Sequence, residues 1–209
     1  LIANSVWSIY IDRHGIIWVG TLQGLSKFNG EEFTPFILPE TALDQNRGVT
    51  STKVVHSIME DSKGAMWFGT TEGAFIYDGT SLTNNSVNDI LEDKNGNIWF
   101  ATHYKGVCFW DGVSFTRLDT KERASGTEVW SLYEDESGQI WFPIESFGVY
   151  RYNEESLINF NEKDGLTSNA IQCVFEDKEG RLWLGGYTGL FRYDGNSFIS
   201  VTQNGPWTE

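Results

Sequence analysis

The stretch Asp12-Arg13-His14-Gly15-Ile16-Ile17-Trp18 holds an aspartate, a glycine three residues later and a tryptophan three residues after that. The same spacing returns at Asp61–Trp67, Asp93–Trp99, Asp135–Trp141 and Asp177–Trp183. The five tryptophans are 49, 32, 42 and 42 residues apart, close to the roughly 40–45 residues of a four-stranded propeller blade. The repeat therefore predicts an all-β fold, a five-bladed β-propeller with four antiparallel strands in each blade.

One copy shows how the sequence builds a blade. Its aspartate and glycine, Asp135 and Gly138, suit a tight turn, because Asp accepts hydrogen bonds from its own backbone and Gly adopts positive φ. Pairs such as Asp111-Gly112 are strong signals for a second hairpin turn. The four strands expected around these turns are 129–134, 139–142, 148–152 and 157–160.

The whole chain is interpreted as a single propeller domain. Its blades are expected at about 1–36, 54–84, 86–118, 128–160 and 170–201, and the insert 37–53 is the one place where a helical turn is expected. Residues 1–6 are in register with 166–171, and residues 203–207 with 163–167. This register favours a ring that closes on itself after five blades, although five blades of a longer array would give the same register.

Composition narrows the classes of partner. The chain has 29 acidic and 15 basic residues, for a net charge of −14, so phosphate backbones and anionic lipids would repel it. We therefore expect the chain to bind no nucleic acid and not to insert into a membrane. A monomer is also expected. Cys108 and Cys173 lack metal-ligand spacing and are expected to be small buried residues. Asp93–Asn97 has some likeness to a calcium loop, but the same spacing forms a turn in every copy, so no metal or cofactor is predicted.

A longer pattern accompanies the repeat, V-x-x-I-x-E-D-x-x-G-x-x-W-F-G-T-x-x-G-L-x-x-Y-D-G-x-x-F, in segments such as Val55–Leu82 and Ile171–Phe198. With the linker Glu162–Asn169, this pattern resembles the two-component-regulator propeller repeat. The resemblance implies a sensor or ligand-binding domain of an exported bacterial protein, located in the periplasm or outside the cell, with any signal segment outside this chain. A more distant similarity to streptogramin-lyase propellers keeps an enzyme possible.

Residues that the copies share build the scaffold, so the positions where they differ are the candidates for function. One such position stands eleven residues before each repeat tryptophan. Side chains there stack or form hydrogen bonds, and each follows a Val or Ile: Trp7, His56, Asn88, Trp130 and Gln172. We expect them to surround the mouth of a central channel, as the floor of a polar and aromatic pocket. The alternative is a channel plug that contacts ordered water.

The loop between the second and third strands also differs. The distance from the tryptophan to the loop glycine is six residues in copies 1, 2 and 5 but seven in copies 3 and 4. The two longer loops lie in adjacent blades and supply His103, Tyr104, Lys105, Glu145 and Phe147, beside Trp130 and Asn88. Surface loops also vary in length without function. The favoured interpretation is a site for a small polar molecule, with a carbohydrate fragment or oligosaccharide as the leading class.

Three functions remain open at this stage. The first is a binding module without catalysis, the second a lyase or hydrolase in which His103 acts with Tyr104, Lys105 or Glu145 in proton transfer, and the third a scaffold that binds another protein. No catalytic residue is assigned, because the chain has no nucleophile motif such as GxSxG or HExxH.

Overall fold

Five antiparallel sheets follow one another along the chain in the computed structural model, which describes residues 1–38, 54–77, 86–118, 128–201 and 205. Blade 1 contains β1 (Val6–Ile11), β2 (Ile17–Thr21), β3 (Gly24–Phe28) and β4 (Phe33–Phe36). Blade 2 contains β5 (Val55–Glu60), β6 (Met66–Thr70) and β7 (Gly73–Ile76), and residues 78–85, where its fourth strand was expected, lie outside the described ranges.

The other three blades have four described strands each. Blade 3 contains β8 (Val87–Glu92), β9 (Ile98–Thr102), β10 (Val107–Trp110) and β11 (Phe115–Arg117). Blade 4 contains β12 (Tyr133–Glu134), β13 (Ile140–Ile144), β14 (Gly148–Asn153) and β15 (Ser156–Phe160). Blade 5 contains β16 (Ile171–Glu176), β17 (Leu182–Gly186), β18 (Gly189–Tyr193) and β19 (Phe198–Val201). The predicted all-β fold and its antiparallel blades are confirmed.

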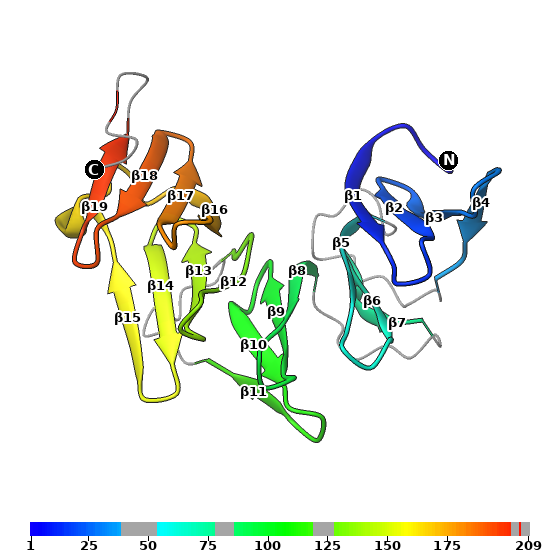
Figure 1. Ribbon diagram of the computed structural model, residues 1–209, viewed down its shortest axis with the longest axis horizontal. Coiled ribbons are helices and arrows are strands. Elements are labelled where there is room, and N and C mark those ends of the chain that lie inside the picture. The colour runs from blue at the N-terminus through cyan, green and yellow to red at the C-terminus, as the bar shows by residue number, and fades with distance from the viewer. Residues whose placement is uncertain (39–53, 78–85, 119–127, 202–204, 206–209) are drawn as a thin grey trace.

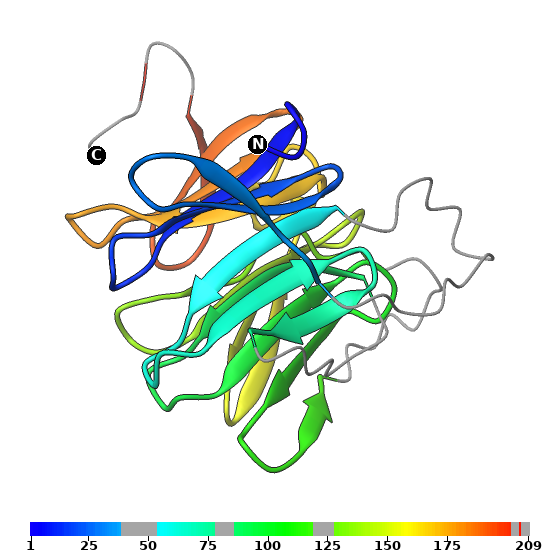
Figure 2. The same ribbon diagram turned by 90° about the vertical axis from the view of Figure 1, so that its right-hand side faces the viewer.

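The blades form an open arc (Figure 1), with blade 1 at one end and blade 5 at the other. Within the arc, the first strands of neighbouring blades contact one another, as β1 contacts β5 and β5 contacts β8. The ring that we expected to close after five blades is therefore not formed in this structure. Figure 2 shows the blades from the side, with their sheets stacked one over the next.

The repeated aspartate organises both the turn and the tryptophan. In blade 3 one oxygen of Asp93 accepts the backbone N–H groups of Asn95 and Asn97, both at 2.9 Å, and the other accepts the indole N–H of Trp99 at 2.7 Å. The indole bond recurs in every blade at 2.7–2.8 Å. A buried tryptophan thus keeps a partner for its N–H group, which removes the cost of leaving that donor unsatisfied.

The repeat predicts that all five of its tryptophans are buried between blades, and the structure confirms this for four of them. Trp141 of blade 4, for example, belongs to one apolar cluster with Val174, Leu184 and Phe191 of blade 5. Trp18, Trp67, Trp99 and Trp141 are 2–4% exposed. For Trp183 the prediction of burial is wrong. It is only partly buried, because blade 5 is the last blade of the arc.

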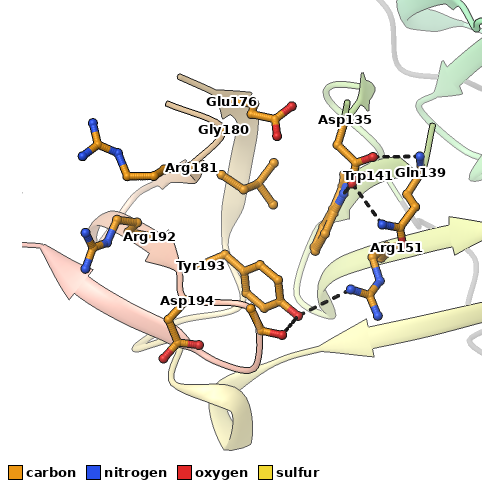
Figure 3. Close-up of a pocket in the computed structure, with 12 residues that line it drawn as sticks. Asp135, Gln139, Trp141, Arg151, Glu176, Gly180, Arg181, Arg192, Tyr193 and Asp194 are labelled. Atoms are coloured by element: carbon orange, nitrogen blue, oxygen red, sulfur yellow. Dashed lines mark hydrogen bonds between the residues drawn. The ribbon is translucent and has the colours of Figure 1, made fainter. Parts of the chain in front are cut away.

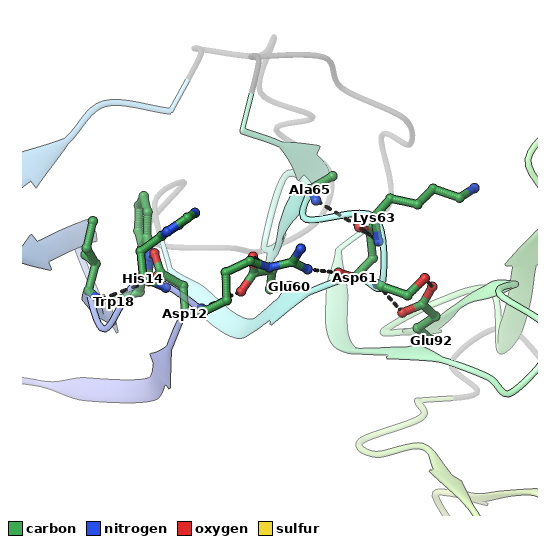
Figure 4. A network of polar contacts seen from close by, with 11 residues as sticks. Asp12, His14, Trp18, Glu60, Asp61, Lys63, Ala65 and Glu92 are labelled. Carbon is green, nitrogen blue, oxygen red and sulfur yellow. Dashed lines mark hydrogen bonds and ion pairs between the residues drawn. The ribbon is translucent and has the colours of Figure 1, made fainter.

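Neighbouring blades are also joined at their first hairpin turns. In each of the four interfaces, the backbone N–H after the repeat aspartate donates to the glutamate that precedes the repeat aspartate of the next blade. We call this contact the turn clasp. The donor–acceptor pairs are Arg13–Glu60 at 2.8 Å, Ser62–Glu92 at 2.6 Å, Lys94–Glu134 at 3.0 Å and Glu136–Glu176 at 3.0 Å. Figure 4 shows the first two clasps around Glu60 and Glu92.

Three local expectations need correction or fall outside the described ranges. The first strand of blade 4 is shorter than predicted, because its start at Val129 forms only an isolated bridge with Ile144. A 3-10 turn at Glu162–Asp164, closed by a capping box from Asn161, lies outside the insert where a helical turn was expected; residues 39–53 of that insert are not described. Cys173 is exposed and Cys108 only half-buried, so neither is the fully buried residue that we expected.

Candidate functional site

A β-bulge sets the orientation of the residues that we expected at the channel mouth. In β1, β5, β8 and β16 the strand register shifts at the same place, between Val6 and Ser8 in β1 and at the equivalent pairs elsewhere. The residue left out of the pairing is Trp7, His56, Asn88 or Gln172. Because a bulge inserts one unpaired residue, it redirects that side chain from the regular alternation of the strand.

Three blades contribute to one polar cluster on the face that carries the longer loops. His103, in the loop after β9, pairs through Nδ1 with the carboxylate of Glu128, which lies just before blade 4. The ring of Tyr104 meets the His103 ring edge-on, with centroids 4.2 Å apart. We call His56, Asn88, His103, Tyr104 and Glu128 the mouth cluster.

Asn88 and His56 form the inner part of the mouth cluster. Asn88 is 8% exposed, and its side-chain amide donates to the carbonyl of Val129 at 2.9 Å, which ties blade 3 to blade 4. His56 lies in an edge-on contact with Trp7 of blade 1, with ring centroids 5.3 Å apart. Trp7 itself is 54% exposed, so this end of the cluster offers an aromatic face to solvent.

The titratable groups of the mouth cluster have shifted pKa values. Burial, and then the electrostatic interaction with nearby His103, lowers the pKa of His56 from 6.5 to about 4. Burial raises the pKa of Glu128; His103 and a hydrogen bond with Asn88 oppose that rise, whereas Glu145 adds to it. At neutral pH His56 is therefore a neutral imidazole, which can both donate and accept a hydrogen bond.

The structure brings together only some of the predicted site residues. Glu145 reaches the cluster, and its backbone N–H donates to the carbonyl of Glu128 at 2.9 Å. Lys105 is exposed, and no ion pair joins it to Glu145 in the described part of the chain. Phe147 packs against the apolar core shared by blades 3 and 4. Gln172 is exposed at the far end of the arc, in blade 5.

Glu128 is the residue of the mouth cluster that the sequence reasoning missed. It stands two residues before Trp130, a position held in the other copies by Ser5, Val54, Ser86 and Ala170. Glu128 is thus the one charged residue at a position that is small or apolar in the other four copies. An alignment of the five copies at this position would have identified Glu128, because the copies differ there.

A partly buried carboxylate, that of Asp89, joins three neighbouring blades. Asp89 accepts the hydroxyl of Ser57 from blade 2 at 3.0 Å and the backbone N–H of Leu132 from blade 4 at 2.9 Å. Burial raises the pKa of Asp89, and these hydrogen bonds oppose the rise. Asp89 thus links three blades and supports the site without belonging to the mouth cluster.

A cavity of about 500 Å³ lies elsewhere, between blades 4 and 5 at the face that carries the hairpin turns. Figure 3 shows Trp141, Arg151 and Tyr193 on its walls. The Arg151 guanidinium lies over the Trp141 ring, 5.4 Å from the centroid, and donates to the Tyr193 hydroxyl at 3.4 Å. Glu176, also in the lining, accepts the turn clasp of blade 4. These groups already bind one another, so we interpret the cavity as part of the joint between blades.

The described part of the chain has no cluster of three or more His, Cys, Asp or Glu side chains suited to a metal ion. The calcium-like segment illustrates the reason, because both oxygens of Asp93 already accept hydrogen bonds from its own hairpin. The described ranges also contain no helix with the length and apolar character needed to cross a membrane.

Comparison with solved structures shows that the fold is that of a β-propeller. The extracellular domain of a hybrid two-component system, BT3049 from B. thetaiotaomicron, is 21% identical, with a TM-score of 0.64 over 97% of this chain and 40% of that one. Virginiamycin B lyase from Staphylococcus aureus is 16% identical, with a TM-score of 0.70 over 96% of this chain and 71% of that one. A streptogramin B lyase is 13% identical, with a TM-score of 0.73 over 99% and 71%.

The comparison with curated proteins gives no match. The family model described as "Two component regulator propeller" matches residues 1–23, 48–72, 81–104 and 165–188. These segments contain four of the five first strands, β1, β5, β8 and β16. Four segments of the chain, one for each of blades 1, 2, 3 and 5, thus match the two-component regulator propeller repeat.

Proposed function

We propose that this propeller is a sensor-type module that binds a small polar molecule at the mouth cluster. The observation that carries the proposal is the His103–Glu128 pair between blades 3 and 4. The ring of Tyr104 packs edge-on against His103, and the exposed ring of Trp7 contacts His56 of the same cluster. Trp130, two residues after Glu128, is partly exposed. Charged and aromatic side chains that converge from several blades, at positions where the repeats differ, are typical of a binding site rather than of a scaffold.

The residue types favour a carbohydrate fragment as the ligand. The ring of Tyr104 is 38% exposed and offers a flat apolar face to the C–H groups of a sugar. Glu128 and neutral His56 supply acceptors and donors for hydroxyl groups. Hydrogen bonds from a hydroxyl to a carboxylate are stronger than those between neutral groups, so Glu128 would fix the orientation of the ligand.

Family context supports a role in sensing outside the cytoplasm. The repeat is named for two-component regulators, and the similar domain of BT3049 is the extracellular domain of such a system. We extend this location to the present chain and propose that it works in the periplasm or outside the cell. Its net charge of −14 suits a soluble ligand that is neutral or positively charged better than an anionic polymer.

A thermal-shift screen tests the proposal. The probes are neutral and acidic oligosaccharides, free amino acids and short peptides, each added to the wild-type chain and to His103→Ala. His14→Ala is the matched control, because His14 lies in the first hairpin turn of blade 1, on the opposite face. We expect a sugar to raise the melting temperature of wild type and of His14→Ala but not of His103→Ala. A sugar that raises all three equally would contradict the site.

A second function, lyase or hydrolase chemistry, is favoured by the same histidine–carboxylate pair. A carboxylate bonded to one ring nitrogen orients an imidazole so that the other nitrogen can take a proton from a substrate. The fold similarity to virginiamycin B lyase makes virginiamycin B a reasonable probe. Turnover of such a probe that is lost in His103→Ala would favour the enzyme, and binding without turnover would favour the sensor.

A further inference from the structure

The outward face of blade 5 is an apolar surface at the end of the arc. Cys173 and Phe175 of β16, Trp183 of β17 and Leu190 of β18 line a depression of about 390 Å³ there, together with Asp177 and Gly185. Phe175 is 58% exposed. Burial of an aromatic side chain of that size is favourable, so an exposed ring of this kind favours a partner.

The equivalent positions in blades 1 to 4 are all covered by the following blade. Phe175 corresponds to Tyr10, Met59, Leu91 and Tyr133, each of which packs against a cluster that includes the next blade. Leu190 corresponds to Leu25, Ala74, Val107 and Val149, each 0% exposed. The outward face of blade 5 therefore has the chemistry of a blade-to-blade interface.

Blade 1 lacks the residues that would complete this interface. In all four turn clasps the acceptor is a glutamate directly before the repeat aspartate, but blade 1 has Ile11 before Asp12. Lys178 of blade 5, at the donor position, would therefore meet an isoleucine. Blade 1 also has Ser26 at the position where blades 2, 4 and 5 have an aromatic ring. The Ser26 hydroxyl accepts the backbone N–H of Ile2 at 3.1 Å.

The curvature of the arc is consistent with this mismatch. Five blades cover 71% of each lyase propeller on which the arc superposes. The remaining share corresponds to about two more blades of the same size. An arc with this curvature leaves a gap between blades 5 and 1 that direct contact between them would not fill.

We infer that the outward face of blade 5 docks a further propeller blade of the same repeat type, one that is not among the five of this chain and that carries a glutamate at the clasp position. The carboxylate of the incoming blade would accept the Lys178 N–H. Val, Ile and Phe side chains like those on the inward faces of blades 2 and 3 would cover Phe175 and Leu190. The inference is independent of the proposed ligand site.

Cys173 reports directly on whether this face is covered. The Cys173 thiol is exposed. Cys108 is half-buried, and burial raises the pKa of the Cys108 thiol to about 11.

The first test uses a Cys108→Ser background and measures the rate at which Cys173 reacts with a chromogenic disulfide. We expect the 209-residue chain to react as fast in buffer as in denaturant, at every protein concentration. Slow reaction independent of concentration would mean that blade 1 closes the ring, and slow reaction only at high concentration would mean that a second copy docks. Either result would overturn the inference.

A six-repeat chain tests the proposed occupant. Gly165 and Gly205 both have positive φ, +98° and +110°, and hold matching places in the linker, so residues 1–205 followed by a second copy of 166–209 keep the register. The added copy carries Cys173→Ser. We expect the original Cys173 to react at least about tenfold more slowly, because only local opening exposes a covered thiol. The control adds Glu176→Ile in the new copy, which places there the residue that blade 1 has, and should lose most of the protection. Unchanged reactivity in a folded six-repeat chain would contradict the inference.

Discussion

His103 of blade 3 and Glu128 of blade 4 pair across the boundary between two blades, through Nδ1 of the imidazole and the carboxylate. The loop after β9, between Thr102 and Gly106, is one residue longer than in blades 1, 2 and 5, and it contains His103. Neither partner comes from the repeated framework. The pair therefore joins two differences between copies, which is why the proposed site is centred on it.

A double-mutant cycle should show that the two side chains are coupled. His103→Ala, Glu128→Ala and the double variant are unfolded with urea at pH 7. We expect a coupling free energy of roughly 0.5–1 kcal/mol, because the side chains are 34% and 12% exposed and solvent screens the pair. His14 and Glu31, which have no such contact between them, form the control cycle. A coupling no larger than that of the control would show that the pair does not form in solution.

Trp99→Ala should destabilise the chain by about 3–5 kcal/mol, the usual cost of removing a large core aromatic. Trp99 is 3% exposed and packs in the core of blades 3 and 4. Its loss also leaves Asp93 without the indole donor. The comparison is Trp7→Ala, whose ring is 54% exposed and whose loss should cost much less. Equal changes in the denaturation midpoint would refute the assignment of the repeat tryptophan to the core.

His56 should make the protein less stable in mild acid. Its pKa is about 4 in the folded chain and 6.5 ordinarily, so between these values the unfolded chain binds the proton and the folded chain does not. Stability from this group is therefore full above pH 6.5 and falls as pH drops toward 4, by on the order of 3 kcal/mol. His56→Gln should flatten this part of the pH profile of the melting temperature, whereas His14→Gln should leave it unchanged. A wild-type profile that already matches His56→Gln would contradict the prediction.

Asp89→Ala should cost about 1–3 kcal/mol, because it leaves the Ser57 hydroxyl and the Leu132 N–H without their acceptor. Asp89→Asn should cost less, since the amide oxygen can still accept one of these bonds and burial already disfavours the charge. Chemical denaturation measures both variants. If asparagine were as costly as alanine, the three-blade link would depend on the charge and not on the hydrogen bonds.

The sequence determines the blades because their chemistry is local. The Asp-to-Trp spacing carries a turn, an indole bond and a buried ring within seven residues, as Asp93 and Trp99 show. The five sheets could therefore be predicted with nearly correct strand bounds. Two features could not be predicted in this way: the shortened first strand of blade 4 and the partial burial of Trp183. Each depends on contacts with a neighbouring blade.

The candidate site was predictable only in part. The differing positions identified His56, Asn88, His103 and Tyr104, since a residue that breaks the repeat is visible in one sequence. The bulge that turns His56 and Asn88 out of the strand pairing is a property of backbone register, which the residue types alone do not reveal. Phe147 was placed in the site because it is aromatic, but it packs into the core, so its loss would test stability and not binding.

Hydrogen–deuterium exchange with and without a bound sugar tests the central claim most directly, because it locates the ligand on one of two faces. The probe is the oligosaccharide that gives the largest thermal shift with wild type. We predict protection in 102–106 and 128–132, around His103 and Glu128, and none in the hairpin turns at 135–139 and 177–181. Protection confined to those turns, or the same protection in His103→Ala, would contradict a binding site at the mouth cluster.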